Sequence, residues 1–203
     1  LQETGIPIVV GDVMNANFPQ DTILSDSYYG MYTLTNYVLQ KGHRDIMFVG
    51  AIHKNPVLAD RFYGFCRAMM EAGISVTQNH ILVDRDENGH YALSASQLSH
   101  IPTAFICSRD SSAYQLLKIL KEKNIRVPED VSITGFDDYI LSSLCTPKIT
   151  TYSIDVAKLT DSCIWLLLER IAQPDSPLQH IVISGKIMER DSVRTLSTNL
   201  EPR

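Results

Sequence analysis

Short apolar runs alternate along this chain with longer stretches in which apolar residues recur every three or four positions. The runs are mostly apolar on both faces, which is typical of strands covered on both sides in a parallel sheet. Five such strands are predicted at 6–10, 45–49, 81–84, 103–107 and 131–136, and a further one around 181–183.

The stretches between these runs predict four helices, each with one apolar face. Asp26 is placed to cap the first helix and Gly42 to end it. The other three are expected at about 60–72, 110–123 and 156–174. The segment 174–177, which carries two prolines, is interpreted as a linker. Regular alternation of strand and helix predicts an α/β fold with a doubly wound sheet.

Composition and charge narrow the class of protein. The 203 residues, 44% apolar and 20% charged, suffice for one generous domain or two small lobes of an ordinary globular protein. No apolar run approaches the roughly 20 residues that cross a bilayer, which argues against a membrane protein. Acidic residues outnumber basic ones 23 to 18, and this net charge of −5 argues against direct binding of a polyanion such as DNA.

The cysteines indicate the redox state of the compartment in which the protein works. There are four of them, with no C-x-x-C pair: Cys66, Cys107, Cys145 and Cys163. This spacing is typical of buried thiols in a reducing compartment rather than of a disulfide framework or a zinc site. We therefore expect a cytoplasmic protein.

The common motifs of catalysis and cofactor binding are missing from the sequence. It has no glycine-rich dinucleotide loop, no Walker lysine loop, no G-x-S-x-G elbow and no H-E-x-x-H. The six histidines are not spaced like metal ligands, and His43, directly after Gly42, is interpreted as a helix cap. The sequence therefore predicts no enzyme activity, no metal and no cofactor.

Charged side chains follow four of the predicted strands: Asp12, Arg61, Arg109 and Asp137. In open α/β sheets, ligands bind at the carboxyl ends of the strands. Aspartate accepts hydrogen bonds from hydroxyls and arginine offers a planar fork of donors, so the four together predict a cage for a polyol or a small polar ring. Taken singly, each aspartate also fits a turn or an N-cap, and each arginine a surface ion pair.

Seven short motifs follow one another along the chain. They are IPIVVGD at 6–12, D-S-Y-Y-G at 26–30 with GHRDI at 42–46, RFYGF at 61–65, PTAFIC at 102–107, VPEDVSITGFDD at 127–138, TT at 150–151 and ERDS at 189–192. In this order they resemble the effector-binding core of the lactose-repressor (LacI/GalR) family of bacterial transcription regulators. The similarity covers about residues 5–195, and the run at 127–138 is its most specific part.

The resemblance implies two Rossmann-like lobes with parallel sheets, on the type I plan of periplasmic binding proteins. Three crossings would join the lobes, at 23–25, 152–154 and 177–179. The lobes would comprise 25–151 with 179–203 (the C-terminal lobe) and 1–24 with 154–177 (part of the N-terminal lobe). The family's helix-turn-helix has no counterpart in this sequence, so operator DNA would be bound only through a segment outside it. We expect a partial lobe to expose apolar sheet edge and to favour association.

The resemblance further implies a sensor of a small-molecule effector, a sugar or sugar derivative, whose binding closes the lobes. The family's effector contacts are matched by Asp12, Arg61, Arg109 and Asp137, although at position 109 asparagine or a small polar residue is commoner in the family. In this family an aromatic ring often stacks on the effector. Which residue takes that position here is left open, with Arg85, His90 and Tyr91 as the candidates. Two arginines in one cleft raise the hypothesis of an anionic effector, such as a phosphosugar or a uronate. In the alternative, Arg109 pairs with Asp137 or Asp110 and the sugar is neutral.

Partners and competing functions follow from the same resemblance. The family implies a homodimer, formed by the outer face of the helix at 111–120 and the segment 139–148. The alternative function is a periplasmic sugar-binding protein of a transporter, which shares the two-lobed plan. An enzyme with Asp137 and Asp138 as acid and base is less favoured, because adjacent residues in a turn point in different directions.

Overall fold

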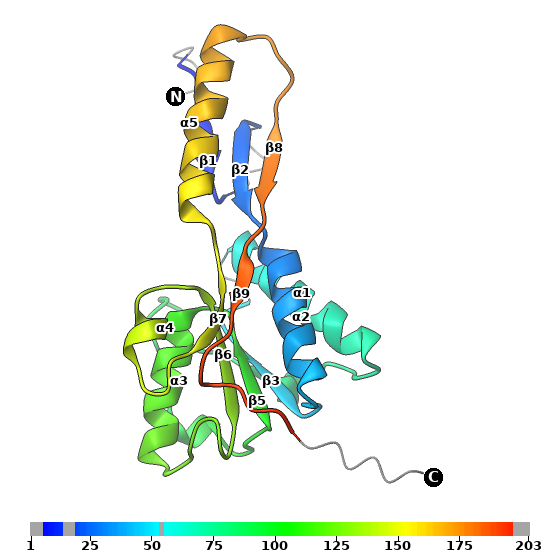
Figure 1. Ribbon diagram of the computed structural model, residues 1–203, viewed down its shortest axis with the longest axis vertical. Coiled ribbons are helices and arrows are strands. Elements are labelled where there is room, and N and C mark those ends of the chain that lie inside the picture. Colours follow the sequence, from blue (N-terminus) through cyan, green and yellow to red (C-terminus); the bar gives the residue numbers. More distant parts are fainter. Residues whose placement is uncertain (1–5, 14–18, 53–54, 197–203) are drawn as a thin grey trace. The chain divides into compact units, whose positions relative to one another are not determined.

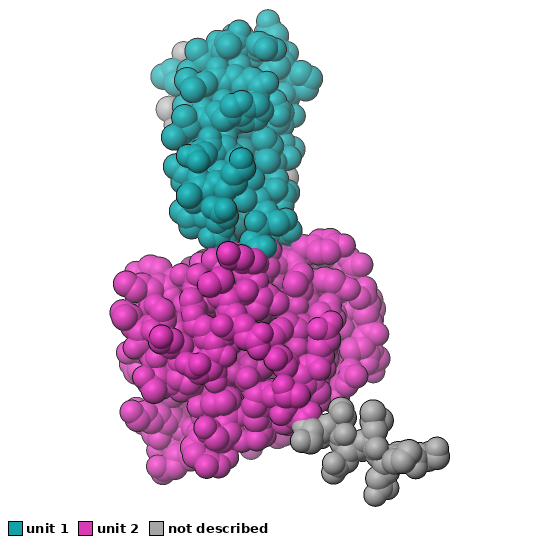
Figure 2. Space-filling view, viewed as in Figure 1, with its two compact units in different colours: residues 1–26, 154–185 teal, residues 27–153, 186–203 magenta. Residues whose placement is uncertain are grey.

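The chain forms two compact units, each built from two separate segments. The computed structural model describes residues 6–13, 19–52 and 55–196. Unit 1 comprises residues 1–26 and 154–185, and unit 2 comprises residues 27–153 and 186–203 (Figure 2). Within the described ranges, no helix is both long and apolar enough to cross a membrane.

Unit 2 is organised around a six-stranded sheet with the order β4-β3-β5-β6-β7-β9. The strands are β3 (Ile46–Val49), β4 (Ile81–Leu82), β5 (Ala104–Cys107), β6 (Ser132–Asp137), β7 (Thr150–Ser153) and β9 (Lys186–Met188). All neighbours are parallel except β7 and β9, which are antiparallel. β5 is buried along its whole length, as expected of a central parallel strand with helices on both faces. The predicted α/β fold with parallel sheets is confirmed.

Helices cover both faces of this sheet. α1 (Ser27–Gln40) and α2 (Pro56–Glu71) lie together on one side, and α3 (Asp110–Glu122) lies on the other (Figure 1). The short α4 (Leu141–Leu144) follows β6, and two 3₁₀ turns occupy Gln78–His80 and Ala95–Gln97. α1 ends at Gly42, whose φ of 92° is the left-handed conformation that glycine adopts without strain, as the sequence predicts.

α2 begins four residues before its predicted start. Asn55 is its N-cap, with the side-chain oxygen accepting a 2.9 Å hydrogen bond from the backbone N–H of Leu58. Pro56 occupies the first helical position, where its fixed φ suits the helix and its missing N–H has no cost. This early start carries Arg61 into the second turn of the helix.

The core of unit 2 joins the sheet to α3 through Phe105, Ile133, Leu116 and Leu120, all fully buried. His43 is buried with them and does not serve as the helix cap that the sequence suggests. Its Nδ1 lies 3.0 Å from the Thr103 hydroxyl, and its Nε2 lies 3.0 Å from the Arg194 carbonyl and 3.1 Å from the Ser132 hydroxyl. Burial lowers the pKa of His43, because a charged imidazole is disfavoured there.

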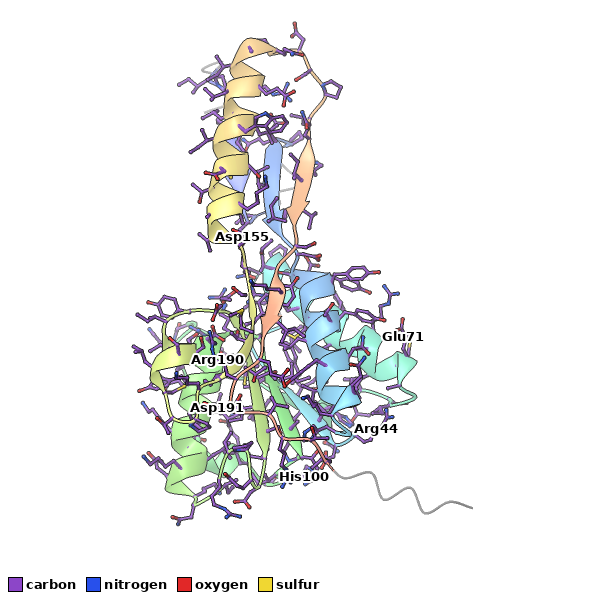
Figure 3. The ribbon with its side chains drawn as sticks, viewed as in Figure 1. Arg44, Glu71, His100, Asp155, Arg190 and Asp191 are labelled. Carbon is purple, nitrogen blue, oxygen red and sulfur yellow. The ribbon has the colours of Figure 1, made fainter. Side chains whose placement is uncertain are left out.

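Unit 1 has a three-stranded parallel sheet, β1-β2-β8, covered by one long helix (Figure 1). Its elements are β1 (Val9–Gly11), β2 (Asp21–Ser25), α5 (Val156–Ala172) and β8 (His180–Ile183). The helix begins at Asp155, labelled in Figure 3, whose carboxylate accepts a 2.9 Å hydrogen bond from the Lys158 N–H. On α5, Val156, Ile164, Trp165, Leu168 and Ile171 are exposed, and Val182 is exposed on the edge strand β8.

The third crossing between the units lies later than the sequence predicts. β8 pairs with β2, and the division between the units falls after Gly185 rather than at 177–179. The segment 174–177 is a tight turn and not a linker. Arg170 donates hydrogen bonds to the carbonyls of Pro174, Ser176 and Pro177, and its guanidinium forms an ion pair of 2.7 Å with Asp21. These contacts fasten the turn to unit 1.

Candidate functional site

The strand order of unit 2 contains a point where successive connections leave in opposite directions. After β3 the chain continues through α2 to β4 on one side, and after β5 it continues through α3 to β6 on the other. In sheets of this order, the crevice outside the carboxyl ends of the two strands is where ligands bind. Three of the four predicted site residues belong to unit 2: Arg61 in the second turn of α2, Arg109 as the N-cap of α3 and Asp137 at the end of β6.

Arg61 ties the ends of three elements together. Its side chain is only 2% exposed. Nε donates to the Ser27 hydroxyl at 3.3 Å, Nη1 to the Ser108 carbonyl at 2.7 Å and Nη2 to Asp137 Oδ1 at 2.7 Å. The guanidinium also lies 3.9 Å from the centre of the Phe136 ring, a favourable cation–π distance. Buried in this way, Arg61 fixes the start of α1 and the ends of β5 and β6.

Asp137 is the more accessible member of this ion pair, with 34% of its side chain exposed. Its backbone has a φ of 100°, and that of Asp138 has a φ of 57°. Non-glycine residues are strained in this region, and such strain concentrates at binding and catalytic sites. The conformation presents the Asp137 carboxylate at the end of β6.

Asp138 points to different partners. Its carboxylate accepts a 2.5 Å hydrogen bond from Arg190 Nη2, and Arg190 also donates to Ser142 and to the Ile149 carbonyl. Arg190 is labelled in Figure 3, beside α4. Because Asp137 and Asp138 are each held by a different arginine, they do not form a shared acid–base pair.

Asp110 holds the turn after β6 in place. It is fully buried, and it accepts 2.6 Å hydrogen bonds from the Thr151 hydroxyl and from the Tyr139 N–H. Burial raises the pKa of Asp110 to about 7, and the charges of Asp137 and Asp138 act in the same direction. Asp110 follows the motif at 102–107 by three residues, but its role in holding the turn after β6 depends on tertiary contacts.

A small cavity of about 150 Å³ opens at the same strand ends. Its lining residues are Ala51, Asn55, Leu58, Asp84, Arg85, Gly89, Ser108 and Arg109. Arg109 is thus the predicted site residue that faces this space. Its Nε is buried with no hydrogen-bond partner in the described part of the chain, and no ion pair there joins Arg109 to Asp137 or Asp110.

Of the three residues left open for stacking on an effector, Arg85 is the one that lines the small cavity. This arginine lines the cavity, donates to the Gly89 carbonyl at 3.0 Å and stacks on Tyr91, with 3.8 Å between guanidinium and ring centre. His90 has an 80% exposed side chain and lies 3.4 Å from Asp86. No aromatic ring is present among the described residues that line the cavity.

Asp12, the fourth predicted residue, belongs to unit 1. It also has a positive φ, of 58°. Its Oδ1 accepts hydrogen bonds from the N–H of Ser25, at 3.0 Å, and from the Ser25 hydroxyl. These contacts tie the residue after β1 to the end of the neighbouring parallel strand β2.

A larger cavity, of about 900 Å³, lies beside the edge strand β4 and α2. It shares Ala51 and Arg85 with the small cavity. Its other lining residues include Phe62, Val76 and Ile81. Its lining surface is mainly apolar, although Arg85, Asp86 and Glu87 also line it, whereas the small cavity is lined by Asp84, Arg85 and Arg109.

Comparison with known proteins places the chain in a family. The sequence profile of the family described as periplasmic binding protein-like domain matches residues 35–193. The chain belongs to this family. The HTH-type transcriptional repressor PurR of Vibrio atlanticus (strain LGP32) is 31% identical over 195 residues, which are 95% of this chain and 58% of that protein. The PurR of Salmonella newport (strain SL254) is 35% identical, over 93% of this chain and 56% of that protein. The chain therefore spans little more than half the length of these relatives.

Solved structures agree with this family. A LacI family transcriptional regulator from Enterococcus faecium, with bound ribose, matches with a TM-score of 0.84 and 25% identity over 97% of this chain and 74% of that one. A transcription regulator like protein from Staphylococcus haemolyticus matches with a TM-score of 0.79 and 27% identity, over 97% and 70%. Within the family, the chain is similar to the effector-binding core of LacI-type regulators.

Proposed function

We propose that this chain senses a small polar effector, a sugar or a sugar derivative, for a cytoplasmic transcription regulator and does not transform it. The observation that supports this most is the cluster at the carboxyl ends of β5 and β6, where buried Arg61 holds the half-exposed Asp137. A carboxylate in this setting accepts hydrogen bonds from hydroxyls. The free cysteines of the chain fit a reducing compartment.

In this proposal Asp137 contacts the effector and Arg61 positions it, while Asp12 and Arg109 supply further contacts. Effector binding favours one arrangement of the two units, because only an effector with unequal affinity for two states shifts their equilibrium. The shift controls a DNA-binding segment elsewhere in the protein. The regulators among the relatives favour this function over that of a periplasmic transport protein.

A ligand panel tests the proposal. The chain is heated with neutral sugars, sugar phosphates, uronates and purines, and its melting temperature is recorded against ligand concentration. Binding to the folded state raises the melting temperature, by an equivalent of about 2.7 kcal/mol at one hundred times the dissociation constant. We expect a dose-dependent rise with one chemical class and recovery of that ligand unchanged. Conversion of the ligand would point to an enzyme, and a flat panel would contradict the sensor function.

We also propose that the regulator is a homodimer through the outer face of α3 and the segment 139–148. Tyr139, Ile140 and Leu144 are exposed there, the last at 71%. Exposed apolar side chains that lie together mark association surfaces. Sedimentation of Leu144→Lys should show monomers under conditions where the parent is dimeric. Leu168→Lys, on the exposed face of α5, is the matched control and should leave the dimer intact.

A further inference from the structure

One buried hydrogen-bond acceptor and one buried donor belong to residues that line the same cavity. Neither atom has a hydrogen-bond partner among the described residues. Asp84 is 2% exposed, and its Oδ1 accepts no hydrogen bond from any described residue. Its other oxygen accepts from the Ser112 hydroxyl, which holds the carboxylate in place. Arg109 Nε is the second such atom, and both residues line the 150 Å³ cavity. A buried acceptor or donor that makes no hydrogen bond carries a desolvation cost. A ligand group that bonds to it can remove this cost.

The charges of the cavity lining are uneven. Arg85 and Arg109 contribute two guanidiniums, and Asp84 contributes one carboxylate. Arg85 Nε lies 3.9 Å from Asp84 Oδ2, which is longer than a hydrogen bond. The charge of Arg61 is already paired with Asp137, so it does not supply the second arginine of the anion hypothesis. Arg85 takes that place.

We propose that this cavity binds the acidic group of the effector, so that the effector is an acidic sugar, either a sugar phosphate or a sugar carboxylate. Arg85 and Arg109 bind the anion, since guanidinium forks match phosphate and carboxylate oxygens. Asp84 Oδ1 accepts a hydrogen bond from a neighbouring hydroxyl of the same ligand. This inference rests on the sensor function proposed above.

The size of the cavity agrees with this assignment. Its 150 Å³ is below the ~300–1,000 Å³ of pockets for drug-sized ligands, so it fits one acidic group with the adjoining part of a sugar ring. A phosphate alone would meet the Asp84 carboxylate as a like charge. Asp84 therefore selects against the bare ion and for an anion that carries a hydroxyl.

The test uses the 203-residue chain, because every lining residue of the cavity lies in unit 2. Glucose 6-phosphate, ribose 5-phosphate and glucuronate are titrated against the chain, together with glucose, ribose and inorganic phosphate. We expect the acidic sugars to bind at least about 10-fold more tightly than their neutral parents. Arg85→Gln and Arg109→Gln should each weaken acidic sugars by about 10-fold or more. Arg126→Gln removes the same charge from an exposed site paired with Asp130 and should change nothing.

Asp84→Asn provides a second test, in which the affinities for two ligands should change in opposite directions. It should tighten inorganic phosphate, because the like charge is gone, and weaken the acidic sugars relative to phosphate, because the hydroxyl loses its carboxylate acceptor. Circular dichroism and the melting temperature verify that this variant folds. If it does not fold, Arg85→Gln on the half-buried Arg85 carries the test.

The outcomes separate the two proposals. A neutral sugar that binds as tightly as its acidic form, unaffected by the Arg85 and Arg109 variants, overturns the acidic subsite and leaves the sensor function standing. Preferred binding of a purine overturns the acidic subsite and the sugar class of the effector, and leaves only a sensor of another small polar molecule. If no compound of any class binds, the sensor function itself fails and the subsite fails with it.

Discussion

Arg61 donates a 2.7 Å hydrogen bond to Asp137 across 76 residues of sequence, and this contact joins α2 to the end of β6. The arginine is buried and the aspartate is partly exposed, so one partner serves the architecture and the other faces the strand-end crevice. The predicted site residues therefore fall into different roles. Arg61 and Asp137 act as a pair, whereas Arg109 belongs to the neighbouring cavity with Asp84 and Arg85.

Loss of Arg61 should destabilise the fold. Arg61→Leu leaves Asp137, Ser27 and the Ser108 carbonyl without their donor, and we expect a cost of about 2–3 kcal/mol, because the remaining Asp137 carboxylate is partly exposed. The free energy of unfolding in urea measures the effect. Arg67→Leu, which breaks an exposed pair with Glu71, should cost less than about 1 kcal/mol. Equal losses from both variants would refute the structural role of Arg61.

Stability should depend on the ionisation of Asp110. Its folded pKa of about 7 lies above its ordinary 3.8, so the folded state holds this proton more tightly than the unfolded state does. The resulting stabilisation is complete below about pH 4 and is lost as the pH rises to about 7, with a size on the order of a few kcal/mol.

Asp110→Asn should flatten this part of the stability–pH curve. The amide oxygen can accept from the Tyr139 N–H, and the amide nitrogen can donate to the Thr151 hydroxyl, so both contacts survive. Urea unfolding at several pH values provides the measurement, with Asp191→Asn on the surface as the control. A slope that persists in Asp110→Asn would assign the dependence to another group.

His43 should contribute to the pH dependence of stability with the sign opposite to that of Asp110. Burial lowers its pKa, so the unfolded state takes up the proton first as the pH falls. The contribution of neutral His43 is present above about pH 6.5 and is lost as the pH falls below that value. The titration of the His43 ring, followed by NMR, should have its midpoint below the ordinary histidine pKa of about 6.5. A midpoint at or above that value would contradict the buried, neutral ring.

α1 and α2 approach each other closely at Gly64. A Cβ at this position would lie 2.2 Å from the Tyr28 carbonyl oxygen, which is backbone and cannot rotate away. Gly64→Ala should therefore lower the free energy of unfolding by about 1–3 kcal/mol. Gly11→Ala is the control, since its Cβ would meet Cys163 Sγ at an ordinary 3.6 Å. Thermal unfolding of both variants distinguishes a close approach from a general effect of alanine.

The sequence predicts the parts of the fold in which local pattern and burial agree. β5 is a continuous apolar run, β6 is buried from Ser132 to Phe136, and Gly42 follows α1 where its position indicates. β2, Asp21–Ser25, lacks that pattern because Asp21, Thr22 and Ser25 are buried with polar partners, Arg170 and Asp12 among them. Such pairing depends on residues far away along the chain.

The site shows the same limit. The positions of Arg61, Arg109 and Asp137 after the strands predict that all three lie at one edge of the sheet. The burial of Arg61 depends on three tertiary hydrogen bonds, and the unpartnered oxygen of Asp84 depends on the cavity that surrounds it. Sequence spacing contains neither of these facts.

Mapping the bound effector onto the backbone tests the central claim most directly. The chain is labelled with ¹⁵N and titrated with the strongest binder of the panel. The account predicts amide shift changes at Ser108, Arg109, Asp84 and Asp137, and their loss in the variants of the acidic subsite. Changes confined to the larger cavity, at Phe62, Val76 and Ile81, would place the ligand beside β4 and contradict a site at the strand ends.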